Sequence, residues 1–126
     1  MKINNLEQIK ILFDKIIHQY QLAGYPRIVQ PVLGGSYALH YVHKTLRRTP
    51  NNNLDIILLV NDEHWVEEAL HYTALLGQPH LEHTPIGPNI LIHGFALGHD
   101  QHFNLWLVNE PIDVVMYNGI STANLS

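Results

Sequence analysis

The stretch from Val32 to Val60 constrains the fold more than any other part of the chain. An apolar run ends at Gly34-Gly35-Ser36, a segment with helical spacing follows from Tyr37 to Arg48, and a strand-like run from Leu54 to Val60 carries Asp55. Where a strand ends in two glycines and a helix begins, bare backbone N–H groups lie at the positive end of the helix dipole, which suits a phosphate. An acid on the next strand would lie beside that phosphate. The stretch therefore predicts a strand, a phosphate-binding turn, a helix and a second strand.

Length and composition limit what this stretch can belong to. A chain of 126 residues can bury roughly two thirds of its unfolded surface, so we expect residues 1–126 to form a single domain. The net charge of −4 provides no general basic surface for nucleic acid, and the absence of cysteine excludes disulfides and thiolate metal sites. We see neither a signal-peptide core nor a run of membrane-spanning length, and we expect a cytoplasmic protein.

The segments before this stretch have simple patterns. Asn4 or Asn5 can cap a helix whose apolar residues recur at intervals of three and four and which ends near Gly24. The short apolar run Ile28 to Leu33 then predicts a strand. Within it Pro31 indicates an edge position or a bulge, because proline cannot donate to the hydrogen-bond ladder.

The segments that follow alternate in the same way. The apolar run Leu54 to Val60 predicts a strand buried on both faces and therefore central in its sheet. Asn61 or Asp62 can cap a helix that continues to Leu76. Gln78 to Asn89 contains three prolines and indicates a loop or a poorly regular edge.

The last third of the chain is strand-like. The runs Ile90 to Leu97 and Phe103 to Val108, separated by Gly98 to His102, predict an antiparallel hairpin. The tail Pro111 to Gly119 fits either a short helix that begins with proline or a further strand from Ile112 to Tyr117. We therefore predict an α/β fold with a mixed sheet of about four or five strands and helices mainly on one face.

Three segments occur in a characteristic order: Gly34 to Tyr41, the basic pair Arg47-Arg48, and Asn53-Leu54-Asp55-Ile56. Together they resemble the nucleotidyltransferase fold of the DNA polymerase beta type, and within it the minimal nucleotidyltransferases and the abortive-infection toxin family. In that family a strand ends in Gly-Gly-Ser or Gly-Gly-Thr, a helix follows, and the next strand carries Asp-x-Asp. The resemblance implies a nucleotidyltransferase-like core that acts on a nucleoside triphosphate with Mg²⁺.

The resemblance also implies roles for individual residues. Gly34, Gly35 and Ser36 would bind phosphate, with Arg48 as a further phosphate contact, and Asp55 would bind the metal. Two carboxylates at alternate strand positions point to the same face, so both can hold the ions that bridge the triphosphate.

The acidic motif of this chain departs from the family pattern. One alignment places Asn53 at the first acid and Asp55 at the second, and the other places Asp55 first and Ile57 second. The third acid, expected on a later strand, corresponds to Asn104, with Asp113 as a possible substitute. The catalytic positions Asp55, Asn53 and Asn104 thus contain a single carboxylate.

Three hypotheses follow for the function. The first is a nucleotidyltransferase that transfers a nucleotidyl group to an unknown acceptor. The second is a catalytically inactive module of the same fold, antitoxin-like or regulatory, that acts through a protein partner or a homodimer. The third is a small α/β protein in which the Gly-Gly-Ser turn is only structural.

The ten histidines allow a further hypothesis. His40 and His43, His80 and His83, and His99 and His102 are pairs with a spacing that a zinc ion can use. A closed zinc site needs four ligands, and no cysteine or clear carboxylate completes a set, so we expect pH sensitivity rather than a zinc site.

Overall fold

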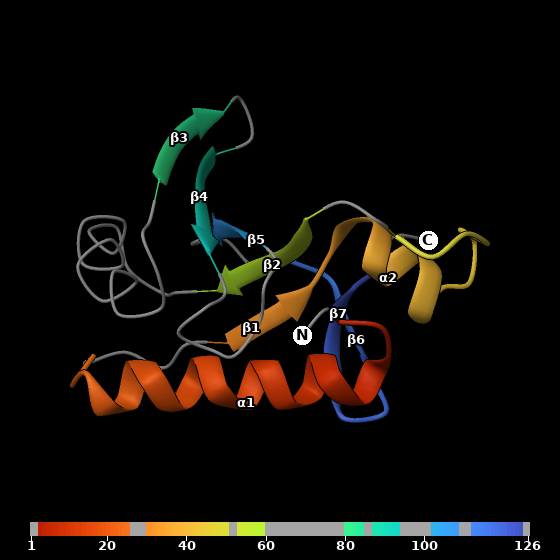
Figure 1. Ribbon diagram of the computed structural model, residues 1–126, viewed down its shortest axis with the longest axis horizontal. Coiled ribbons are helices and arrows are strands. Elements are labelled where there is room, and N and C mark those ends of the chain that lie inside the picture. Colours follow the sequence, from red (N-terminus) through yellow and green to blue (C-terminus); the bar gives the residue numbers. More distant parts are fainter. Residues whose placement is uncertain are drawn as a thin grey trace.

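A computed structural model of the chain describes residues 3–25, 30–50, 53–59, 80–84, 87–93, 102–108 and 112–124. Two helices and seven strands lie in these ranges (Figure 1): α1 Leu6–Leu22, β1 Gln30–Leu33, α2 Gly35–Tyr41, β2 Leu54–Leu59, β3 His80–Thr84, β4 Gly87–His93, β5 His102–Val108, β6 Val114–Tyr117 and β7 Ile120–Ala123. No helix in this part of the chain has the length and apolar character needed to span a membrane.

The strands form one mixed sheet in the order β3-β4-β5-β2-β1-β7-β6. β2 pairs with β5 in parallel and with β1 antiparallel, while β1 pairs with β7 in parallel. The predicted α/β class with a mixed sheet is therefore confirmed, as is the central position of β2. The antiparallel pairing expected for the two strands before Val108 is also confirmed, because β4 and β5 pair antiparallel. Residues 94–101, between these strands, lie outside the described residues.

Helix α1 covers one face of the sheet (Figure 1) and begins with a reciprocal cap. The Asn5 side chain accepts from the Gln8 backbone N–H at 2.9 Å, and the Gln8 side chain accepts from the Asn4 N–H at 2.7 Å. The first bond satisfies one of the donors that a helix start leaves unpaired, and the second connects the residue before the cap to the first turn. The helix ends at Leu22, close to the predicted end at Gly24.

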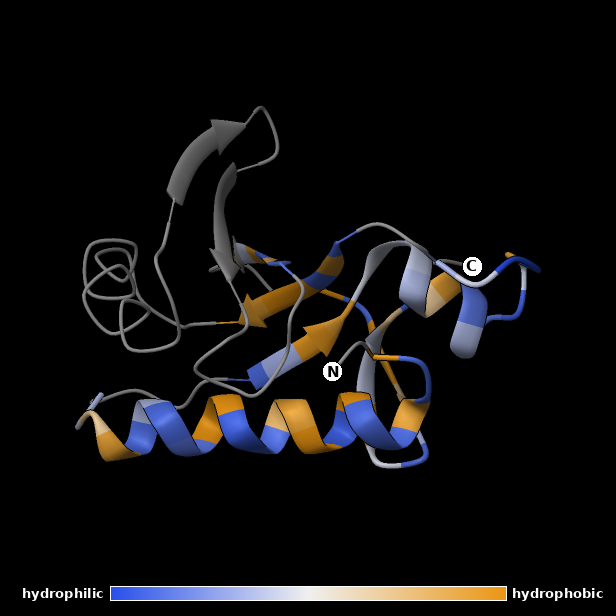
Figure 2. Ribbon diagram, in the orientation of Figure 1, coloured by the Kyte–Doolittle hydropathy of each residue, from blue (hydrophilic) through white to orange (hydrophobic). Residues whose placement is uncertain are grey.

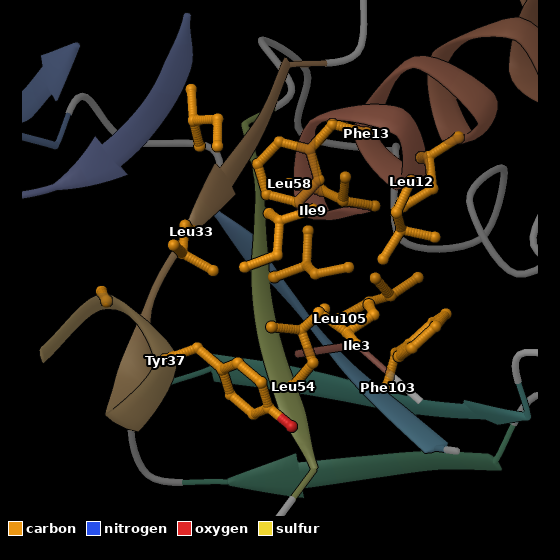
Figure 3. Close-up of a cluster of buried hydrophobic side chains, with 14 of the residues drawn as sticks. Ile3, Ile9, Leu12, Phe13, Leu33, Tyr37, Leu54, Leu58, Phe103 and Leu105 are labelled. Atoms are coloured by element: carbon orange, nitrogen blue, oxygen red, sulfur yellow. The ribbon is translucent and has the colours of Figure 1, made fainter. Parts of the chain in front are cut away.

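The core lies between α1 and the sheet. Figure 2 shows hydrophobic and hydrophilic residues alternating along α1, while β1 and β2 are largely hydrophobic. In Figure 3, Ile9, Leu12 and Phe13 point from α1 toward side chains of the strands. The fully buried members of this cluster are Ile9, Leu12, Ile16, Leu33, Ala38, Leu54, Ile56, Leu58, Phe103, Leu105 and Ile120.

Burial alternates along β2. Leu54, Ile56 and Leu58 are buried in the α1 face, whereas Asp55 and Ile57 are half-buried on the opposite face. The expectation that both faces of this strand are fully buried is therefore wrong. The period of two assigns Asp55 to the face that α1 leaves open.

The expectation of an edge position for Pro31 is also wrong, because β1 lies between β2 and β7. Gly34 N–H donates to the Asp55 carbonyl. Because hydrogen-bonded pairs alternate along the ladder, the backbone N–H and C=O groups of the even-numbered residues of β1 face β2, and those of the odd-numbered residues face β7. β7 is paired with β1 only at Leu33. Proline can therefore occupy position 31 of an interior strand. Its nitrogen, which carries no hydrogen, faces β7 at a point where the described β1–β7 ladder has no hydrogen bond for it to make.

The remaining differences lie at the ends of the sheet. The tail forms the strand β6, which selects the second of its two interpretations, and β7 was not predicted. β3 falls in the segment expected to be a loop or an irregular edge, and it forms one edge of the sheet. The helix expected between residues 61 and 76 lies outside the described residues.

Candidate functional site

The site begins where β1 ends against β2. The antiparallel register places Leu33 opposite Ile56, so the next residue, Gly34, lies opposite Asp55. Gly34 N–H donates to the Asp55 carbonyl oxygen at 3.0 Å. The glycine turn and the acid that the sequence singles out are thus brought together by the sheet ladder itself.

Gly35 packs its backbone directly against the Asp55 carboxylate. Its φ of +60° lies in the left-handed region, and a Cβ built there would collide with Oδ2 of Asp55 and lie 2.9 Å from its carboxyl carbon. A Cβ on Gly34 would lie 3.2 Å from Cδ1 of Ile57, which is tight but on a flexible side chain. Position 35 therefore requires glycine for two independent reasons, its backbone angle and the acid.

The parallel pair β2–β5 adds a residue that the sequence patterns did not identify. The register places Asn104 beside Asp55 and Trp106 beside Ile57, so all four side chains belong to the same face. Trp106 Nε1 donates to Asp55 Oδ1 at 2.9 Å. The carboxylate is therefore held between the indole N–H on one side and the Gly35 backbone on the other. The sequence feature that could have identified Trp106 is its position two residues after Asn104, which places both side chains on the same face of the strand.

These residues line a groove of about 310 Å³ on the face opposite α1. Its described lining consists of Gly34, Gly35, Asp55, Ile57, Trp106 and Val108. One end is formed by glycine backbone and a carboxylate, and the rest by apolar side chains. Such a groove can orient a ligand that has a polar end and an apolar body.

The other predicted site residues are not among the described residues that line this groove. Ser36 is half-buried in the first turn of α2. Asn53 is half-buried immediately before β2, and Asn104 is half-buried on β5 opposite Asp55. Asp113 lies before β6, which β1 and β7 separate from β2, and its carboxylate accepts from the Asn124 amide at 2.7 Å. Asp113 therefore does not replace an acid at this groove.

Helix α2 is shorter than predicted and ends at Tyr41, so Arg47 and Arg48 are exposed residues beyond it rather than its last turn. The chain reverses at Lys44, whose φ is 59°, and His40 Nδ1 lies 2.8 Å from the Leu46 carbonyl oxygen. The backbone N–H groups of Thr45 and Leu46 both donate to the Leu39 carbonyl. These contacts satisfy the end of α2 without further helical turns.

The histidines of this region contact backbone carbonyls. His43 Nε2 lies 2.9 Å from the Ala123 carbonyl oxygen and so connects the segment after α2 to the end of β7. In the part of the chain that the structure describes, no group of three His, Asp or Glu side chains is arranged to hold a metal ion. The pairs at positions 80 and 83 and at 99 and 102 include side chains outside the described residues.

Helix α2 also carries a tyrosine whose pKa is shifted. Burial raises the pKa of Tyr41 above its ordinary value of 10, and the neighbouring Tyr37 raises it further. The rings of Tyr37 and Tyr41 stack with their centroids 6.1 Å apart. The neutral phenol is therefore the form that the folded protein favours.

Comparison with known proteins gave no family model, no curated protein and no solved structure that matches this chain.

Proposed function

We propose that the chain is a nucleotidyltransferase-like protein whose groove beside Asp55 binds a nucleoside triphosphate together with Mg²⁺. The observation that supports this most is the Asp55 carboxylate packed against the Gly34-Gly35 turn at one end of the groove. The triphosphate would lie over the glycine turn, and the nucleoside along Ile57, Trp106 and Val108. We expect the cytoplasm as the compartment, because both ligands are abundant there.

The donor set fits a Mg²⁺ ion that the nucleotide brings with it. Magnesium is usually bound through one or two carboxylates and several phosphate or water oxygens. Asp55 would hold the ion, and the amide oxygen of Asn104, beside it in the register, would be a neutral neighbour. When bound, the ion would neutralise charge on the phosphates. The hydrogen bond from Trp106 would keep the carboxylate oriented. The carboxylate could still bind the ion, because a carboxylate oxygen can accept more than one partner.

A catalytically inactive binding module is the second candidate. The observation that favours it is that Asp55 is the one carboxylate among the described residues lining the groove, with Asn104 opposite it. A neutral amide does not supply the charge by which a second acid retains metal ions. Such a module would bind the nucleotide without transferring it and would act through a partner, as an antitoxin-like or regulatory subunit does.

An NMR titration of the chain with Mg²⁺ and each of the four nucleoside triphosphates tests the proposal. We expect saturable amide shifts at Gly34, Gly35 and Ser36 in the wild type. The shifts should weaken at least about tenfold in affinity for Asp55→Ala, which loses the charge that attracts the Mg²⁺ complex. Asp113→Ala is the matched control, because this acid lies outside the groove. An absence of shifts at millimolar nucleotide would refute the nucleotide site.

Restoring the missing acids distinguishes the two candidates. In the doubly substituted chain Asn53→Asp with Asn104→Asp, release of pyrophosphate from a nucleoside triphosphate is measured next to the wild type. Gain of turnover or of Mg²⁺ affinity supports a nucleotidyltransferase centre that has lost acids. Nucleotide binding with no gain in either quantity supports the binding module.

A further inference from the structure

A second cavity lies beside α1, on the side of the sheet opposite the Asp55 groove. Its volume is about 250 Å³, and residues at the start of β1 and of β7 line it together with α1. The α1 residues that line it recur at intervals of three and four: Lys10, Phe13, Asp14 and Ile17. None of the described lining residues is shared with the groove. Sites for drug-sized ligands occupy about 300–1,000 Å³, so this cavity fits a smaller molecule.

Two side chains of opposite charge line this cavity. Lys10 and Asp14 lie one helical turn apart on α1, a spacing at which two charges can form a salt bridge. Among the residues that the structure describes, neither side chain forms an ion pair or a hydrogen bond. The Lys10 side chain instead extends to the β6–β7 turn, which passes close to the N-terminal half of α1 (Figure 1): a Cβ built on Gly119 would lie 3.4 Å from both its Cε and its Nζ. A cation and an anion are therefore both available to a ligand.

The rest of the described lining is mainly apolar. Phe13, Pro31 and Ile120 are buried residues that contribute to it. Gln30 and Ser121 also line the cavity, but the Gln30 amide donates to the Ser121 hydroxyl oxygen at 3.5 Å, so these two polar groups contact each other. An apolar group of a ligand that packs against the buried residues is removed from water, which favours binding.

We propose that this cavity binds a free α-amino acid with an apolar side chain. Lys10 would bind the carboxylate of the ligand, and Asp14 would bind its ammonium group. The ligand side chain would lie against Phe13, Pro31 and Ile120. This site does not depend on the proposed nucleotide site, because the described linings of the two cavities have no residue in common.

The two charges select this class of ligand. A nucleotide or another polyanion would bring its charge against Asp14, and an amine would bring its charge against Lys10. A neutral apolar ligand would cover both charges without pairing either of them, which costs free energy. A small zwitterion pairs both at once. In an α-amino acid a single carbon atom carries both charged groups, so one molecule can reach two side chains that are one helical turn apart.

An NMR titration of the wild-type chain with L-leucine tests the ligand class. We expect saturable amide shifts at Gly119, Ile120 and Ser121, with a Kd of about 1 mM or tighter. Isocaproate lacks the ammonium group of leucine, and isoamylamine lacks its carboxylate. We expect each to bind at least about tenfold more weakly, because one charge of the cavity is then left unpaired. Glycine, which has both charges but no apolar side chain, should also bind more weakly than leucine. Equal affinity for leucine and for either singly charged analogue would overturn the proposal.

Substitutions on α1 test the two charged residues. Lys10→Met and Asp14→Asn each remove one charge, and we expect each to weaken leucine binding at least about tenfold. Lys15→Met and Glu7→Gln are the matched controls, because these residues carry the same charges on the same helix but are not among the described residues that line the cavity. The amide spectrum of each variant shows that it is folded. Unchanged affinity in Lys10→Met or Asp14→Asn would overturn the assignment. An absence of saturable shifts up to about 10 mM leucine, or shifts confined to residues 34–36 of the Asp55 groove, would overturn the site itself.

Discussion

At the scale of single residues, Gly35 and Asp55 depend on each other. The left-handed φ of Gly35 brings its backbone against the carboxylate, and the carboxylate occupies the space that a side chain at position 35 would need. The conformation of the turn and the position of the carboxylate therefore determine each other.

We expect Gly35→Ala to lower the free energy of unfolding by about 2–4 kcal/mol, because it adds a steric collision to the cost of a left-handed alanine. Gly24→Ala is the control, since Gly24 has a φ of +77° but no atom within 4 Å of the place that a Cβ would take. It should cost only about 1 kcal/mol. Urea denaturation of both variants measures the difference, and equal losses would mean that the carboxylate moves aside at no cost.

The hydrogen bond from Trp106 to Asp55 should be measurable as a coupling. In a double-mutant cycle with Trp106→Phe and Asp55→Asn, we expect a coupling free energy of about 1–2 kcal/mol, as for a hydrogen bond to a charged acceptor. Denaturant unfolding at neutral pH of the four proteins gives the value. Additive effects would show that the indole and the carboxylate contribute independently.

Tyr41 predicts a loss of stability at alkaline pH. Its pKa is raised in the folded state, so the folded chain holds the phenolic proton more tightly than the unfolded chain does. The resulting stabilisation is complete below pH 10 and is lost as the pH rises through the folded-state value. We expect Tyr41→Phe to reduce this loss when unfolding is measured from about pH 8 upward. An unchanged slope in the variant would contradict the assignment.

At the scale of elements, the start of α1 gives the next prediction. Asn5→Ala removes the side-chain acceptor for the Gln8 N–H and should cost about 1 kcal/mol. Asn4→Ala is the control, because the Asn4 side chain accepts an exposed hydrogen bond from the Asn5 amide and does not cap the helix among the described residues. Thermal unfolding of both variants checks the difference. If Asn4→Ala costs as much as Asn5→Ala, the cap assigned to Asn5 is wrong.

Sequence periodicity predicted those elements whose pattern is local. The three-and-four spacing of α1 and the apolar runs of β1, β2 and β5 identify their elements without knowledge of their neighbours. The early end of α2 was not predictable, because it depends on the contact of His40 with the Leu46 carbonyl and on the reversal at Lys44. The interior position of Pro31 depends in the same way on how far the β7 ladder extends.

The residues of the candidate site were likewise predicted only where their pattern is local. Gly34, Gly35 and Asp55 were predicted because the turn and the next strand are close in the sequence. Trp106 joins them only through the parallel register between β2 and β5, a pairing over about fifty residues that no local pattern specifies. Its indole N–H was therefore missed, although the strand that carries it was predicted.

At the scale of the whole molecule, the sheet order predicts where stability is greatest. β2 and β1 lie in the interior of the sheet, with β2 buried against α1, whereas β6 is an edge. In amide hydrogen exchange we expect the slowest exchange in β2, with protection close to the global free energy of unfolding. The amides of Val114 and Met116, in the terminal strand β6, should exchange orders of magnitude faster than those of Ile56 and Leu58. Equal protection would contradict this arrangement of the sheet.

The contact between Gly35 and Asp55 also limits how the sequence can diverge. A larger residue at position 35 is accommodated only after position 55 has lost its carboxylate, and even then the backbone angle still disfavours it. The order of substitution is therefore asymmetric: position 55 can change first, but position 35 cannot. In a collection of descendants of this chain, glycine at 35 should persist wherever aspartate remains at 55, so covariation between the two positions would record this steric contact.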